Sequence, residues 1–221
     1  MKHSSAADTQ RLDSISSALQ LPLSPAQREG VLAYVEQLAR WNATYNLTAV
    51  RTPEAVWSQH IADCLAVLPA LDRYLAGLAT PPRVLDVGSG GGLPGVLLAL
   101  MRPALDVTCV DTVGKKAAFV RQVAGVLRLP NLRAEHSRVE ALRTPPQGLI
   151  TSRAFASLPD FVRLTRHVLA PGGTWLAMKG KRPDDELAAL PDDIEVFHVE
   201  PISVPLLDAE RCLVWMQPKP P

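Results

Sequence analysis

The glycine-rich stretch RVLDVGSGGGLPGVLLAL, residues 83–100, has the residue types that bind an adenosine-containing ligand. An apolar strand-like segment ends in glycines and a helix-like segment follows, so the glycines fall in a strand-to-helix turn. Glycine suits this turn because the chain bends sharply and a side chain would keep the ligand away from the backbone. Asp111 lies about 20 residues after Gly90, where a carboxylate accepts hydrogen bonds from ribose hydroxyls.

Two motifs overlap in this stretch, and they predict different ligands. The G-x-G-x-x-G pattern ends at Gly95 and is typical of NAD sites, whereas D-x-G-x-G-x-G begins at Asp86 and is typical of S-adenosylmethionine (AdoMet) sites. A dinucleotide site holds an anionic pyrophosphate near the helix N-terminus, and Asp86 would repel it. AdoMet is cationic at its sulfonium and amine, so Asp86 favours AdoMet. The residues expected to bind it are Asp86, Gly88, Gly90, Gly92 and Asp111.

Strands that alternate with helices predict the frame that positions this turn. From residue 81 onwards, such alternation is typical of βαβ units and a parallel sheet. We therefore expect an α/β fold of the class I, Rossmann-like type, with a mostly parallel seven-stranded sheet. The predicted strands are 84–88, 106–111, 131–137, 148–154 and 174–180, with closing strands at 194–202 and 211–217. The third is followed by Val139 and Glu140, which are placed to reach an adenine edge.

Residues 1–80 are expected to form a helical extension packed on a core of residues 81–221, with no flexible linker between them. Ser24-Pro25 and Thr52-Pro53 are each an N-cap followed by proline, which starts a helix. The segment WNATYNLTAVR, residues 41–51, separates these helices, and its Asn and Thr residues favour turns and caps.

Composition narrows the class of protein. The chain has 221 residues, of which 47% are hydrophobic, and no apolar run is long enough to cross a bilayer. Its first residues lack the apolar region of a secretory signal, so a cytoplasmic protein is expected. The three cysteines, Cys64, Cys109 and Cys212, show no metal or redox spacing and are expected to be buried thiols.

Charge is unevenly distributed although the net charge is only +1. Residues 111–182 contain 13 Lys and Arg against 4 Asp and Glu, a local net charge of +9. Such a segment predicts a phosphate-binding face, although scattered solvated charges would give the same count. The candidate phosphate-binding residues are Lys115, Lys116, Arg121, Lys179, Lys181 and Arg182.

Several segments in order resemble the RsmG (GidB) family. They are WNATYNLTAVR, HIADCLAVLPAL, DVGSGGGLPGVLLA, SRVEAL, TSRAFASL and MKG, which together span residues 41 to 181. The resemblance implies an enzyme that transfers a methyl group from AdoMet to N7 of a guanine in 16S rRNA, leaving S-adenosylhomocysteine, without a metal. It also implies that Gly88 and Leu93 contact AdoMet and that Val139 and Glu140 hold its adenine. One departure is Gly91, where many relatives are expected to have Pro or Ala.

The chemistry implied by this resemblance fits the residues after the fourth predicted strand. Guanine N7 has a free lone pair, so catalysis needs alignment more than a general base. Neither Pro-Cys nor Asn-Pro-Pro-Tyr occurs there, which argues against methylation of pyrimidine C5 or of an exocyclic amine. The segment contains Arg153, which we expect to organise the catalytic pocket and which the resemblance implies borders the cofactor. It also contains Phe155, which either supports the base or packs in the core.

Three further residues have open roles at this stage. His60 and Asp63 lie one helical turn apart, as an acid–base pair or a buried hydrogen-bonded pair, and Asn46 either covers the pocket or caps a helix.

The expected partner is 16S rRNA in the small ribosomal subunit or in an assembly intermediate, with no DNA or membrane partner, and the expected state is a monomer. The alternatives are a methyltransferase for a small molecule or protein, an NAD-dependent oxidoreductase, and an inactive RNA-binding module.

Overall fold

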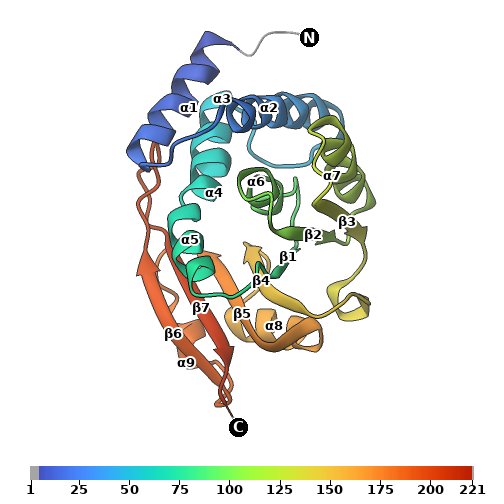
Figure 1. The fold of residues 1–221 in the computed structure, drawn as a ribbon, viewed down its shortest axis with the longest axis vertical. Helices are drawn as coiled ribbons and strands as arrows, with labels where there is room; N and C mark the ends of the chain where they lie inside the picture. The colour runs from blue at the N-terminus through green and yellow to red at the C-terminus, as the bar shows by residue number, and fades with distance from the viewer. Residues whose placement is uncertain (1–4, 221) are drawn as a thin grey trace.

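The computed structural model describes residues 5–220. The absence of a secretory signal was predicted from the first residues of the chain. Residues 1–4 of that stretch lie outside the described range. A seven-stranded sheet forms the centre, in the order β3-β2-β1-β4-β5-β7-β6, and β7 is antiparallel to both of its neighbours (Figure 1). The strands are β1 Arg83–Val87, β2 Asp106–Asp111, β3 Leu132–His136, β4 Gln147–Arg153, β5 Leu169–Lys179, β6 Ile194–Pro201 and β7 Cys212–Pro218. The predicted fold class is confirmed.

Helices cover both faces of the sheet. Alternate strand residues point to opposite sides, so both faces carry apolar side chains. Val84 and Cys109 face one apolar cluster, whereas Leu85 and Val110 face the other. The first cluster is covered by α1 Ala6–Ala18, α2 Pro25–Tyr45, α4 Asp63–Leu65, α5 Leu68–Ala76, α6 Gly95–Met101 and α7 Gly114–Val126. The second is covered by α8 Leu158–Thr165 and α9 Asp184–Ala188 (Figure 1).

Helix α2 begins as the sequence predicts but ends later. Ser24 and Gln27 form a capping box, in which each side chain bonds the other residue's backbone amide. The expected turn over residues 41–45 is wrong, since α2 continues to Tyr45. Asn42 is tolerated because its side chain bonds the backbone of the next loop, at Thr48 N and Val50 O. Asn46 caps α2 in the left-handed conformation, with φ 51°.

The helix predicted from Pro53 is interrupted. It consists of α3 Pro53–Val56, a π-helical turn at Trp57–Ala62 and α4, and a break at 66–67 precedes α5. Single π-turns release carbonyl groups from the ordinary helical ladder and are frequent at functional sites. The region still has a buried side, with Trp57 and Ile61 almost fully enclosed.

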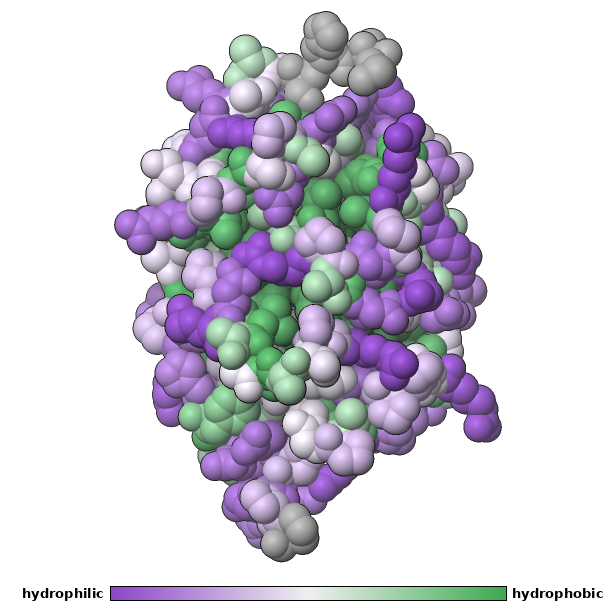
Figure 2. Space-filling model, in the orientation of Figure 1, coloured by the Kyte–Doolittle hydropathy of each residue, from purple (hydrophilic) through white to green (hydrophobic). Residues whose placement is uncertain are grey.

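The surface shown in Figure 2 is mostly hydrophilic, with apolar side chains visible between the charged ones near the middle. Within residues 5–220, no helix is long and apolar enough to cross a membrane. Cys64, Cys109 and Cys212 are free and buried, as predicted.

Candidate active site

The glycine turn follows β1 and has a backbone that favours glycine. Gly88, Gly90 and Gly92 have φ values of 66°, 58° and 81°, which L side chains adopt only with strain. The amide of Gly88 donates to Val110 O at 2.9 Å, which ties the turn to the end of β2. A Cβ atom on Gly90 would touch nothing within 4 Å, so the space beside this residue is open to a ligand.

Asp111 stabilises the same turn from the end of β2. Its Oδ2 accepts from Gly90 N at 2.9 Å and its Oδ1 accepts from Val113 N at 2.8 Å. Each carboxylate oxygen can accept a second hydrogen bond, so Asp111 retains the capacity to bind the ribose hydroxyls of AdoMet. The Ser137 amide, after β3, donates to Asp111 O. The nearby short helix Val139–Ala141 buries Val139 and exposes Glu140.

Asp86 lies behind the glycine turn. It is 0% exposed, and its Oδ2 accepts from Gly95 N at 2.8 Å at the start of α6. Burial raises the pKa of its carboxyl group to about 7, while its Oδ1 has no hydrogen-bond partner among the described residues. The structure therefore gives Asp86 a contact with α6, and its direct contact with AdoMet stays a prediction.

Gly95, at the start of α6, allows the helix to pack closely against β1 and β2. A Cβ atom there would overlap Cys109 Sγ and lie 2.9 Å from Asp86 Oδ2.

A cavity of about 110 Å³ joins the glycine turn to Arg153 and to the N-terminal helices. It brings together residues that are far apart in the sequence. Those lining it are Leu38, Leu47, Thr48, His60, Gly88, Ser89, Gly90, Gly91, Leu93 and Arg153. Of the residues predicted to bind AdoMet, the cavity thus contains Gly88, Gly90, Leu93 and Arg153, whereas Asp86, Gly92, Asp111, Val139 and Glu140 do not line it.

Arg153 is fixed against the π-turn. Its Nη1 donates to Gln59 O at 2.7 Å and to Asp63 Oδ2 at 3.1 Å, and its Nη2 lies 3.3 Å from His60 Nδ1. His60 Nε2 is 2.8 Å from Thr48 Oγ1 on the loop after α2. Burial, and next the charge of Arg153, lower the pKa of His60 to about 4. His60 is therefore neutral at physiological pH. His60 and Asp63 are both buried, but they do not bond each other, and each contacts Arg153 instead.

Phe155 packs on the glycine turn. A Cβ atom on Gly88 would lie 2.7 Å from Phe155 Cδ2, and the Phe155 ring contacts Phe161 edge-on with centroids 6.4 Å apart. Phe155 is half-buried and packs against its neighbours, which is one of the two roles expected for it.

The six basic candidates form two groups on either side of the site. The first group follows β2: Lys115 is exposed, Lys116 lies 3.8 Å from Asp111, and Arg121 donates to Ala134 O. The second group follows β5. Here Lys179 pairs with Glu186, Arg182 pairs with Asp184, and Lys181 is exposed. Among the described residues, Lys115 and Lys181 are the members of this set whose side chains have neither an acidic partner nor a hydrogen bond.

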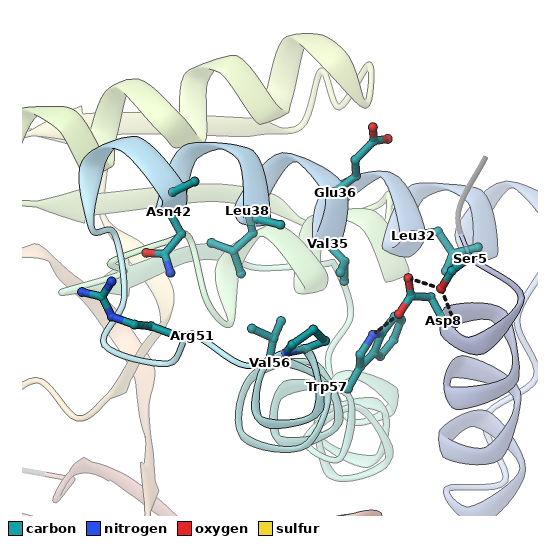
Figure 3. Close-up of a pocket in the computed structure, with 13 residues that line it drawn as sticks. Ser5, Asp8, Leu32, Val35, Glu36, Leu38, Asn42, Arg51, Val56 and Trp57 are labelled. Atoms are coloured by element: carbon teal, nitrogen blue, oxygen red, sulfur yellow. Dashed lines mark hydrogen bonds between the residues drawn. The ribbon is translucent and has the colours of Figure 1, made fainter. Parts of the chain in front are cut away.

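A larger cavity of about 490 Å³ lies between α1, α2 and α3 (Figure 3). Its walls are mostly apolar and include Val35, Leu38, Val56 and Trp57, and the Trp57 indole donates to Asp8 at 2.7 Å. None of the residues predicted to bind the cofactor or RNA lines it. Leu38 belongs to both cavities and separates this one from the site.

The sequence did not indicate the cavity residues Leu38, Leu47, Thr48 and Ser89, nor two residues that bond other members of the site. Tyr34 of α2 donates to Gly91 O at 2.8 Å, and Arg211, just before β7, donates to Asp63 Oδ1 at 2.8 Å. Nothing local to either residue in the sequence signals these long-range contacts. Within residues 5–220, no group of three or more His, Cys, Asp or Glu side chains could hold a metal ion.

Comparison with known proteins gives consistent results. A family model described as rRNA small subunit methyltransferase G (GidB) matches residues 27–214. A protein of Leptothrix cholodnii named ribosomal RNA small subunit methyltransferase G is 59% identical over 202 residues, covering 91% of this chain and 92% of that protein. Its namesake from Polaromonas naphthalenivorans is 55% identical over 203 residues, covering 91% of each chain.

Solved structures with low sequence identity share the fold. An AdoMet-dependent methyltransferase from Thiobacillus denitrificans, in complex with S-adenosyl-L-homocysteine, aligns with a TM-score of 0.56 at 13% identity, covering 81% of this chain and 96% of that one. The [4+2]-cyclase SpnF aligns with a TM-score of 0.60 at 18% identity, covering 90% and 98%. Because one of these two neighbours is a cyclase, the fold alone does not define the reaction.

Proposed function

The chain belongs to the rRNA small subunit methyltransferase G family, and from that premise we propose that the cavity beside Arg153 is where it methylates N7 of a guanine in 16S rRNA. The methyl donor is AdoMet, which supplies the methyl group on a sulfonium. The observation that carries the proposal is that the glycine turn and Arg153 line one cavity. Asp111, at the end of β2, holds the turn in place by accepting a hydrogen bond from Gly90 N.

The residues of the cavity suit a reaction that depends on alignment. Guanine N7 attacks with a free lone pair, so the work of the chain is to hold N7 in line with the methyl group. His60 is neutral and bonded on both sides, to Thr48 and to Arg153, and is therefore suited to holding position. Arg153 supplies a fixed positive charge and N–H donors at the edge where the base would lie.

RNA is proposed to approach along the carboxyl end of the sheet. The strand order places β1 and β4 between β2 and β5, so exposed Lys115 and Lys181 lie on the two sides of the cavity. Both are suited to contact phosphates. The proposed substrate is the rRNA in the small subunit or in an assembly intermediate, and the enzyme is proposed to act as a monomer in the cytoplasm.

The experiment that tests this site compares Arg153→Ala with Arg163→Ala. Arg163 is an exposed arginine on α8 that pairs with Asp160, so its loss controls for removal of a surface ion pair. Transfer of labelled methyl to small subunits from a strain lacking the modification should fall on the order of 100-fold in Arg153→Ala and stay unchanged in the control. Full activity of Arg153→Ala with unchanged AdoMet affinity would refute the assignment.

A further inference from the structure

Asp63 holds two arginines from opposite parts of the chain. Its Oδ2 accepts from Arg153 Nη1 at 3.1 Å, and its Oδ1 accepts from Arg211 Nε at 2.8 Å. Asp63 is 3% exposed, so its two oxygens are largely shielded from water. Each arginine therefore bonds a different oxygen of the same buried carboxylate.

The hydrogen-bond donors of Arg153 are only partly used inside the protein. A guanidinium has five N–H donors. The two on Nη1 are taken by Gln59 O and Asp63 Oδ2, and one on Nη2 points to His60 Nδ1. The Nε donor and the second Nη2 donor have no acceptor among the described residues, and the side chain lines the cavity. Two donors thus remain for a ligand.

We propose that Arg211 is a positioning residue that keeps these two donors of Arg153 available to the cavity. Arginine and a carboxylate prefer a bidentate pair, in which two parallel N–H groups bond both oxygens. If Asp63 Oδ1 were free, Arg153 would gain by turning to bond both oxygens with Nη1 and Nη2, and would withdraw Nη2 from the cavity. Arg211 disfavours this rotation, because a second guanidinium at Oδ1 would bring two positive charges together at one buried oxygen.

The π-turn supplies the complementary restraint. Gln59 O, within the turn Trp57–Ala62, accepts from Arg153 Nη1 at 2.7 Å, so the guanidinium is held by a backbone acceptor in addition to Asp63. The inference rests on the proposed role of Arg153 in methyl transfer, and it adds a residue from the far end of the chain to that site.

The test is a double-mutant cycle of Arg211→Ala and Arg153→Ala, read by the single-turnover rate of methyl transfer and by the melting temperature. If Arg211 acts through Arg153, Arg211→Ala should lower the rate about tenfold in the wild-type background and have no further effect in the Arg153→Ala background. Arg211→Lys, which keeps one donor for Oδ1, should restore most of the rate.

Two outcomes would overturn the inference. An equal loss in both backgrounds would mean that Arg211 contacts the substrate itself, and full activity of Arg211→Ala would mean that it positions nothing. If Arg211→Ala has a much lower melting temperature than the wild type, Arg211→Lys is used to test the inference. A folded Arg211→Lys variant that does not restore the rate would also contradict the inference. Failure of the proposed function is seen separately, as full activity of the single variant Arg153→Ala.

Discussion

The phenol of Tyr34 donates a hydrogen bond to the carbonyl oxygen of Gly91 at 2.8 Å. Tyr34 is 0% exposed, and burial raises the pKa of its hydroxyl well above its usual value, so it remains a donor at any physiological pH. The bond joins α2 to the glycine turn. The N-terminal segment therefore helps to shape the glycine turn, in addition to lining the cavity beside it through Leu38 and Thr48.

Replacing Tyr34 with Phe should weaken AdoMet binding. The variant leaves Gly91 O without its donor, at a cost of about 1–3 kcal/mol, and loosens the turn. Calorimetric titration with AdoMet should show a higher Kd. Tyr45→Phe is the matched control, because Tyr45 is 45% exposed. Equal affinity in both variants would show that the bond to Gly91 does not shape the site.

Gly95→Ala should destabilise the fold by about 1–3 kcal/mol, because the new methyl group overlaps Cys109 Sγ and crowds Asp86. Gly125 in α7 is the matched position, where a Cβ atom meets nothing within 4 Å. Gly125→Ala should stabilise the protein by up to about 1 kcal/mol. Chemical denaturation measures both changes, and a neutral Gly95→Ala would contradict the close packing.

His60 should make stability fall as the pH drops from about 6.5 to about 4. Its folded pKa lies below its unfolded value, so the unfolded state binds more protons in that range and the free energy of unfolding decreases. The shift corresponds to about 3 kcal/mol. Asp86, whose pKa is raised to about 7, contributes with the opposite sign between its usual value and 7.

The contribution of His60 is isolated by the difference between wild type and His60→Gln, because Asp86 is present in both. That difference should shift in favour of the variant by about 3 kcal/mol between pH 7 and pH 4. A difference that stays constant with pH would mean that His60 titrates normally in the folded protein.

Lys115→Ala should weaken binding to rRNA whatever its sequence. It should also reduce the slope of log affinity against log salt concentration by about 1. Lys115 is exposed at the start of α7, the helix that follows β2. Lys219→Ala is the control, since Lys219 is also an exposed cation and lies beyond the end of β7. Identical salt slopes for the two variants would remove Lys115 from the RNA contacts.

The strands and the glycine turn could be predicted from the sequence because their signals are local. Apolar runs bounded by glycine and proline mark β1 to β4, and Asp111 follows the turn at the expected interval. The predicted start of the fifth strand at 174 is wrong, because β5 begins at Leu169 and includes residues 171–173. The family was also correctly recognised, from motifs spread over residues 41 to 181.

The missed features depend on partners that are distant in the sequence. The π-turn at Trp57–Ala62 carries Gln59 O, whose acceptor role needs Arg153, 94 positions away. Arg211 and Asp63 are separated by 148 positions. Helix α2 passes through Asn42 because the Asn42 side chain bonds the following loop, which helix propensity alone does not reveal.

The most direct test of the central claim is the identity of the methylated nucleoside. Small subunits from a strain lacking the modification are incubated with the protein and labelled AdoMet, and the 16S rRNA is digested to nucleosides and separated. The account predicts label in 7-methylguanosine alone, lost in the Arg153→Ala variant. Label in any other nucleoside, or none in the rRNA, would contradict it.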